Sequence, residues 1–332
     1  MRRAVVCGAG GFIGGHLVEY LKSKGYWVMG IDIKEPEYRK IRVDKFVIVD
    51  LRTLPENYFE KMQIDEIYQL ASDMGGMGFI HTHALDCLTN NVTINMKVLA
   101  AAAKAQIPRY FYSSSVCIYP DMKVGDKPLC EEDAYPAKPD NEYGWEKLYS
   151  ERLALQYAKD TPMQVRIARF QNCFGEFGTY DGGREKAPAA MCRKIASVNG
   201  GDTIEVWGDG TAVRNYIYVK DLVRAVYILM QSNMDKPVNI GTEEYITVNE
   251  LIEQVCRISG KRVKKKYVDG AVGVQSRNFT HHRMHSLGWS PEYTIKQGLI
   301  PTYDWIEKQV INQKGILDNP GFKNGQSRHI KV

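Results

Sequence analysis

The 332-residue sequence lacks any apolar run that approaches the ~20 residues of a membrane-spanning helix. The few apolar residues before the first glycines are also too short a run for a secretion signal. The seven cysteines are dispersed and contain no Cys-x-x-Cys pair, which argues against a zinc site and a disulfide framework. We therefore expect a soluble cytoplasmic protein with free thiols and no metal site.

Neither sign of charge dominates the chain, since 44 Lys and Arg residues stand against 39 Asp and Glu residues, a net charge of +5. This small, scattered excess does not predict nucleic-acid binding and suits a protein that handles a small anion. The densest basic run, residues 261–266, has no interleaved aromatic residues and is interpreted as a solvated face. The composition, 44% hydrophobic and 25% charged, is typical of a globular protein with a sizeable core.

Short apolar runs alternate with helical patterns through the first half of the chain. Strands are expected at residues 4–7, 26–33, 45–50, 66–71, 110–115 and 164–170. Helices are expected at residues 12–24, 93–105 and 141–159. Because parallel strands need crossover helices, and these crossovers are right-handed, the pattern predicts an α/β protein with a doubly wound parallel sheet, a Rossmann fold.

A glycine-rich segment, GAGGFIG, lies between the first strand and the first helix. Its glycines fit the spacing G-x-x-G-x-x-G, which lets the backbone approach a pyrophosphate at a helix N-terminus. An aspartate at the end of the second strand can accept both hydroxyls of a ribose and repels a 2′-phosphate, so NAD is favoured over NADP. The candidate NAD-binding residues of this unit are Gly8, Gly11, Phe12, Ile13, Gly14 and Asp32.

The pattern changes after residue 172, where glycine-rich loops separate shorter elements. Helices are expected from residue 188, at 219–231 and at 248–259, with a short strand at 203–207. We predict an NAD-binding Rossmann domain over residues 1–172, with segments near 214–240 returning to it. Residues 173–332 are then mainly a smaller C-terminal α/β substrate-binding domain, whose tail from residue 315 is interpreted as an extended end.

Tyr143 and Lys147 form a Tyr-x-x-x-Lys pair that shares one face of a predicted helix. An ammonium there can lower the pKa of the phenol, which can then exchange a proton with a sugar hydroxyl while hydride moves to or from nicotinamide. The same spacing occurs elsewhere, but only this pair opens a helix after the Ser-Ser-Ser strand. Ser115 ends that strand, where ligands bind in sheets of this kind.

Three segments together, GAGGFIG, SSSVCIYP and YGWEK, resemble the extended short-chain dehydrogenases/reductases that act on nucleotide sugars. Four longer strings narrow the resemblance to the GDP-mannose 3,5-epimerases within the NAD-dependent epimerase/dehydratase family. They are ASDMGGMGFI at 71–80, SSSVCIYP at 113–120, GGREKAPAAMCRK at 182–194 and WGDGTAVRNY at 207–216. The resemblance runs over nearly the whole chain.

Elementary chemistry agrees with this resemblance. Oxidation of the sugar C4 to a ketone acidifies the hydrogens on both C3 and C5, so a base on one face and an acid on the other can invert each centre. The resemblance implies that Cys117 and Lys186 are this acid/base pair, and that Tyr143, Lys147 and Ser115 serve the redox step at C4. A thiol near a ketone can act as a thiolate base when its environment favours the charged form.

Further positions match the family's binding residues. Asp50, at the end of the third predicted strand, matches an adenine contact, and Gly75 matches a position that contacts the sugar. Guanidinium and ammonium groups are what a diphosphate needs. The resemblance implies a substrate-binding set of Gly75, Ser115, Cys117, Asn172, Glu185, Lys186, Ala187, Lys194, Arg214, Arg277 and Ser327.

The activity implied by the resemblance is NAD-dependent epimerisation of a GDP-sugar at C3 and C5. GDP-mannose is the expected substrate, GDP-L-galactose the product and GDP-L-gulose a partial product. A GDP-fucose synthase-like epimerase/reductase and an epimerase of another GDP-sugar remain alternatives. A 4,6-dehydratase is disfavoured because Val116 and Cys117 stand where an acidic pair is needed. A scaffold or redox sensor that keeps the NAD fold without catalysis is a further alternative, and the presence of Tyr143, Lys147, Ser115 and Cys117 together argues against it.

The resemblance also implies a homodimer, in which each subunit contributes two helices. The segments 93–105 and 142–159 are the candidates. Neither a nucleic acid nor a membrane is an expected partner.

Overall fold

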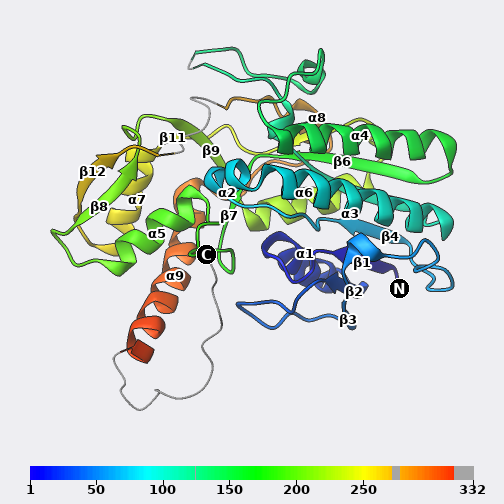
Figure 1. Ribbon diagram of the computed structural model, residues 1–332, viewed down its shortest axis with the longest axis horizontal. Coiled ribbons are helices and arrows are strands. Elements are labelled where there is room, and N and C mark those ends of the chain that lie inside the picture. The colour runs from blue at the N-terminus through cyan, green and yellow to red at the C-terminus, as the bar shows by residue number, and fades with distance from the viewer. Residues whose placement is uncertain (124, 271–276, 318–332) are drawn as a thin grey trace.

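The computed structural model describes residues 1–123, 125–270 and 277–317 of the chain. Its larger lobe is built on a parallel sheet of seven strands in the order β10-β6-β5-β4-β1-β2-β3, which confirms the expected Rossmann topology (Figure 1). The strands are β1 Arg3–Cys7, β2 Trp27–Asp32, β3 Lys45–Ile48, β4 Glu66–Gln69, β5 Arg109–Ser115, β6 Gln164–Phe170 and β10 Val238–Ile240.

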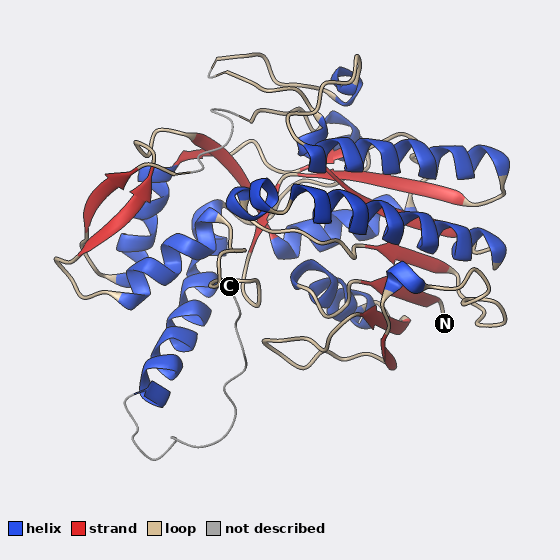
Figure 2. Ribbon diagram, viewed as in Figure 1, coloured by secondary structure: helices blue, strands red, loops and turns tan. Residues whose placement is uncertain are grey.

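Helices cover both faces of this sheet (Figure 2). Alternate residues of a strand point to opposite faces, so Ala4 and Val6 join one hydrophobic cluster while Val5 and Cys7 join another. The first cluster includes α1 Phe12–Ser23 and α6 Val219–Gln231, and the second includes α3 Ala84–Lys104 and α4 Glu142–Asp160. The near-continuous apolar strands of the sequence follow from this burial on both faces.

The strands and helices predicted in the first half are confirmed to within two residues at each end, apart from the helix predicted at 93–105. That helix, α3, begins nine residues earlier, at Ala84, directly after the short α2 Met77–Thr82. The sequence pattern misses this first part because Asn91, although buried, is polar and breaks the apolar periodicity.

A smaller lobe lies beside the sheet and contains β8 and β12, which pair in parallel, together with α5, α7 and α9 (Figure 1). Their bounds are α5 Ala187–Ser197, β8 Thr203–Trp207, α7 Val248–Ser259, β12 Lys264–Val268 and α9 Ile295–Leu317. The expected extended tail is wrong for residues 315–317, because α9 continues through them to Leu317. The remainder of that tail lies outside the described residues.

A second sheet, of three strands in the order β11-β9-β7, lies between the larger and the smaller lobe (Figure 1). Its strands are β7 Asn172–Phe174, β9 Val213–Tyr218 and β11 Tyr245–Thr247. After β9 the chain returns to the larger lobe as α6 and β10, and then leaves it again as β11 and α7. The domain division at residue 172 stays a prediction. Among the described residues, no helix is both long and apolar enough to cross a membrane.

Candidate active site

A cavity of about 950 Å³ opens where the carboxyl ends of the parallel strands meet the smaller lobe. Every predicted site residue in the described part of the chain lines it, from Gly8 after β1 to Arg277 near the end of the chain. Ser327 lies outside the described residues. The fold thus brings together side chains that the sequence spreads over some 270 positions.

The glycine-rich turn packs closely against the neighbouring backbone, which leaves no room for side chains at two of its glycines. Gly8 has a φ of +85°, and a Cβ there would lie 2.8 Å from the backbone nitrogen of Ala71. A Cβ on Gly14 would lie only 2.0 Å from the carbonyl oxygen of Gly8. Within the described chain no side chain caps α1, which begins at Phe12 on the cavity wall. Its first N–H groups are therefore available to an anion, as NAD binding requires.

Asp32 ends β2 and lines the same cavity. One carboxylate oxygen accepts a hydrogen bond of 2.9 Å from the backbone N–H of Gly10, and the other accepts one of 2.7 Å from Ile33. These bonds fix the carboxylate beside the glycine turn, where a ribose would lie. Asp50 lies after β3, where Arg52 forms a 2.7 Å ion pair with it and holds the pKa of its carboxyl below the ordinary value.

Tyr143 and Lys147 lie in the first turns of α4, and both are buried. The helix begins at Glu142 because the Asn141 side chain accepts a hydrogen bond of 2.9 Å from the Gly144 N–H. The Lys147 ammonium donates to the carbonyl oxygen of Ser113 at 3.2 Å and lies 5.4 Å from the centroid of the Tyr143 ring. The predicted Tyr–Lys pair thus shares one face of the helix, next to the end of β5.

The sequence indicated that the Lys147 ammonium can lower the pKa of Tyr143, but in the folded chain the pKa is raised. Burial raises the pKa of Tyr143 well above its ordinary value, and the charges of Cys117 and Glu146 raise it further. A hydrogen bond with Ser115 acts in the opposite direction. Desolvation disfavours the charged phenolate more strongly than the neighbouring polar groups favour it.

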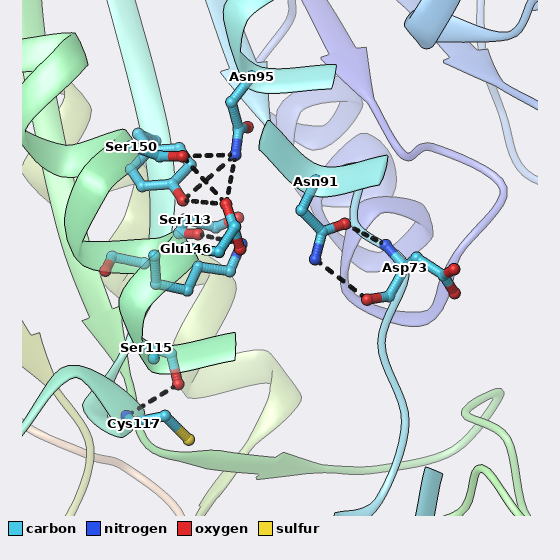
Figure 3. A network of polar contacts seen from close by, with 12 residues as sticks. Asp73, Asn91, Asn95, Ser113, Ser115, Cys117, Glu146 and Ser150 are labelled. Atoms are coloured by element: carbon cyan, nitrogen blue, oxygen red, sulfur yellow. Dashed lines mark hydrogen bonds and ion pairs between the residues drawn. The ribbon is translucent and has the colours of Figure 1, made fainter. Parts of the chain in front are cut away.

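Cys117 lies in a short turn, η2 Val116–Ile118, directly after β5. The Ser115 hydroxyl caps this turn by accepting a hydrogen bond of 3.2 Å from the Cys117 N–H (Figure 3). The turn packs tightly against α4, since a Cβ on Gly144 would lie 2.1 Å from the Cys117 carbonyl oxygen. One close contact therefore fixes the thiol relative to the helix that carries Tyr143.

Lys186 approaches the cavity from the smaller lobe, at the N-terminal end of α5. Burial lowers the pKa of its ammonium, while the charges of Cys173 and Cys117 act in the opposite direction. An amine whose pKa is lowered can give up and regain a proton more easily, as an acid/base group must. The thiol and the amine thus reach one cavity from different lobes.

Two loops from different lobes meet beside this amine. Arg184 forms a 3.0 Å ion pair with Asp73, and its carbonyl oxygen accepts a 3.1 Å hydrogen bond from the Gly76 N–H. A Cβ on Gly76 would lie 2.7 Å from the carbonyl oxygen of Glu185. Asn91 holds the backbone of Asp73 through two hydrogen bonds, of 2.6 and 3.1 Å (Figure 3). These contacts tie the loop that carries Lys186 to the larger lobe.

The predicted phosphate-binding cations differ in their surroundings. Lys194 donates a hydrogen bond of 2.6 Å to the carbonyl oxygen of Glu205. Burial lowers the pKa of Arg214, and the nearby charge of Arg277 lowers it further. Arg277 is itself buried in an ion pair with Asp140. Arg214 and Arg277 both line the cavity, but Asp140 already neutralises Arg277, so the two guanidinium groups do not present two uncompensated charges to a diphosphate.

Several residues that support the site were not predicted from the sequence. Asp140 neutralises Arg277, Cys173 lies near Lys186, and Gly144 lets η2 approach α4. Only Gly144 gave a signal in the sequence, because glycine is a poor helix former and its presence in the first turn of a helix indicates a close contact.

Comparison with known proteins agrees with this geometry. The GDP-mannose 3,5-epimerase of Arabidopsis thaliana is 40% identical over 316 residues, which cover 93% of this chain and 83% of that protein. The GDP-L-fucose synthase of Escherichia coli is 23% identical over 92% of this chain and 96% of its own length.

Solved structures and a family model complete the comparison. The UDP-glucose 4-epimerase of Thermus thermophilus in complex with NAD superposes with a TM-score of 0.81 at 21% identity. It covers 92% of this chain and 98% of that one, and at this identity it shows the fold alone. The model of the NAD dependent epimerase/dehydratase family matches residues 4–241. Together with the 40% identical relative, this match shows that the chain belongs to the NAD dependent epimerase/dehydratase family.

Proposed function

We propose that the protein epimerises GDP-mannose at C3 and C5 through a transient 4-keto intermediate, giving GDP-L-galactose with GDP-L-gulose as a partial product. The observation that carries this proposal is the convergence of Cys117 and Lys186, from two lobes, on the cavity that also contains Tyr143 and Lys147. The 40% identity to a GDP-mannose 3,5-epimerase over 93% of the chain supports this substrate.

The residues divide into a redox group and a proton-transfer group. The glycine turn and Asp32 would hold NAD, which when bound would supply the acceptor and donor of the hydride at the sugar C4. Tyr143, aided by Ser115, acts as a phenolate that the Lys147 ammonium stabilises. It takes the proton of the C4 hydroxyl, becomes the neutral phenol, and gives the proton back when the ketone is reduced again. Cys117 and Lys186 then act from opposite sides of the ring, one removing a proton next to the ketone and the other supplying one.

The alternative of a GDP-fucose synthase-like enzyme is weaker. That reaction needs net reduction by free NADPH, whose 2′-phosphate would meet the Asp32 carboxylate beside Gly10. The identity to the synthase is 23%, against 40% to the epimerase. An epimerase that acts on another GDP-sugar is the second candidate, and the choice of sugar is what the experiment below tests.

The test is to incubate the purified protein with GDP-mannose in deuterated water, without added cofactor, and to locate deuterium in the sugar by NMR. We expect label at C3 and C5 and no label at C4. Tyr143→Phe, which keeps the ring and loses the hydroxyl, is the matched control and should give no label. Absence of label from GDP-mannose, with label in another GDP-sugar, would overturn the substrate proposal.

We further propose a homodimer that forms through α3 and α4. Met96, Trp145 and Tyr149 on these helices are 48%, 45% and 50% exposed, an apolar set that a second copy of the chain would cover. Analytical sedimentation of the wild type and of Trp145→Glu tests this. A glutamate buried in the interface would disfavour association, so the variant should sediment as a monomer.

We also propose that the protein is located in the cytoplasm. All seven cysteines are free thiols, which suits a reducing compartment.

A further inference from the structure

Glu146 is a buried carboxylate that the proposed chemistry does not use. It lies on α4 between Tyr143 and Lys147, and only 1% of its surface is exposed. One carboxylate oxygen, Oε1, accepts hydrogen bonds from Asn95 Nδ2 at 2.8 Å and from Ser150 Oγ at 3.0 Å (Figure 3). These bonds anchor the side chain between α3 and α4.

The other oxygen, Oε2, has a different environment. It is buried and accepts no hydrogen bond from the described residues, and it lies 3.9 Å from the Lys147 ammonium. A buried carboxylate without hydrogen bonds is costly unless a cation is close. Lys147 is the cation within ion-pair distance of Glu146 in the described chain.

The ammonium also lacks another counter-charge in the described chain. Its remaining contacts are the carbonyl oxygen of Ser113 at 3.2 Å and the faces of the Tyr112 and Tyr143 rings at 5.2 and 5.4 Å. Each of these contacts is neutral. A buried ammonium is costly unless a negative charge is close, and Glu146 supplies that charge.

We propose that Glu146 is a positioning residue that acts as the counter-ion of Lys147 and so sets the pH range in which the Tyr143–Lys147 pair works. This inference rests on the proposed function, because it needs an oxidation at C4 that uses the pair. Asn95 and Ser150 hold one oxygen of the carboxylate so that the other remains directed at the ammonium.

The proposal predicts the direction of a pH shift. The charge of Glu146 raises the pKa of Tyr143, so its removal lets the phenol lose its proton at lower pH. Removal of the same charge also lets the ammonium lose its proton at lower pH. The rate of oxidation at C4 should have a bell-shaped dependence on pH, with one limb from Tyr143 and the other from Lys147. Both limbs therefore move to lower pH together. The other titratable groups around the pair are unchanged in the variant, and they are Cys87, Tyr112, Cys117 and Glu151.

The experiment compares the wild type with Glu146→Gln, which keeps the shape of the side chain and loses its charge. The pH profile of reduced-nicotinamide formation, measured by absorbance on adding substrate, should move to lower pH by about one unit at both limbs. A second readout needs no turnover: with isotope-labelled lysine, the NMR signal of Lys147, assigned through its loss in Lys147→Met, should titrate at lower pH in the variant.

Asp160→Asn is the matched control, because it removes a carboxylate charge from an exposed position at the other end of the same helix, α4. Its profile should stay at the wild-type pH. If Glu146→Gln does not fold, Glu146→Asp replaces it: the retained charge should keep the wild-type profile at a lower rate, and a displaced profile would overturn the proposal. A profile of Glu146→Gln that coincides with the wild type, or moves to higher pH, also overturns it. A wild type that forms no reduced nicotinamide with GDP-mannose contradicts the proposed function instead, and the NMR titration still tests the counter-ion.

Discussion

Replacement of Gly144 by alanine tests whether the contact between η2 and α4 positions the Cys117 thiol. The added Cβ would lie 2.1 Å from the Cys117 carbonyl oxygen, a distance that real Cβ atoms do not reach, so the turn must move away by about 0.9 Å. Displacement of a catalytic group by about 1 Å can reduce a rate on the order of 100-fold. Overpacking of this kind also destabilises a fold by about 1–3 kcal/mol.

Deuterium incorporation at C3 and C5 measures the rate, and denaturant unfolding measures the free energy. We expect incorporation to fall on the order of 100-fold while the variant remains folded. Gly200→Ala is the matched control, since a Cβ there meets no atom within 4 Å and Gly200 has an ordinary φ. Wild-type rate and wild-type stability in Gly144→Ala would refute the reasoning.

Further changes probe other parts of the molecule. Cys117→Ala should reduce deuterium incorporation by about 100- to 10,000-fold while the formation of reduced nicotinamide persists, and loss of both in single-turnover absorbance would place Cys117 in the redox step or the fold. Asp32→Ser should raise the affinity for NADP relative to NAD on the order of tenfold in calorimetric titration, because a repelling charge is removed; an unchanged ratio contradicts the role of Asp32. Burial lowers the pKa of His281 to about 4 from 6.5, so the unfolded chain binds the extra proton and stability falls as the pH falls from 6.5 towards 4. The free energy of unfolding, measured as a function of pH, should therefore fall by up to about 3 kcal/mol less in His281→Gln than in the wild type. If the two free energies depend on pH with the same slope, His281 is not responsible for the loss.

Local patterns in the sequence were sufficient to predict most strands and helices of the larger lobe. Strands buried on both faces are apolar throughout, and the crossover rule leaves few ways to order them. The glycine turn and the pair Tyr143 and Lys147 were found because each depends on a short spacing along the chain, and Asp32 was found because it ends the next strand. The start of α3 was missed because Asn91 is buried for its hydrogen bonds with Asp73, which no apolar period reveals.

The sequence by itself determined the fold class, the cofactor-binding turn and the chemical types that the site contains, because these depend on periodicity and on residues close along the chain. Only the tertiary structure decided how charges from distant segments neutralise or perturb one another. Burial raises the pKa of Tyr143 although Lys147 is near, and Asp140 pairs with Arg277 from 137 positions away. Desolvation and ion pairing depend on distances through space, and those exist only once the chain has folded.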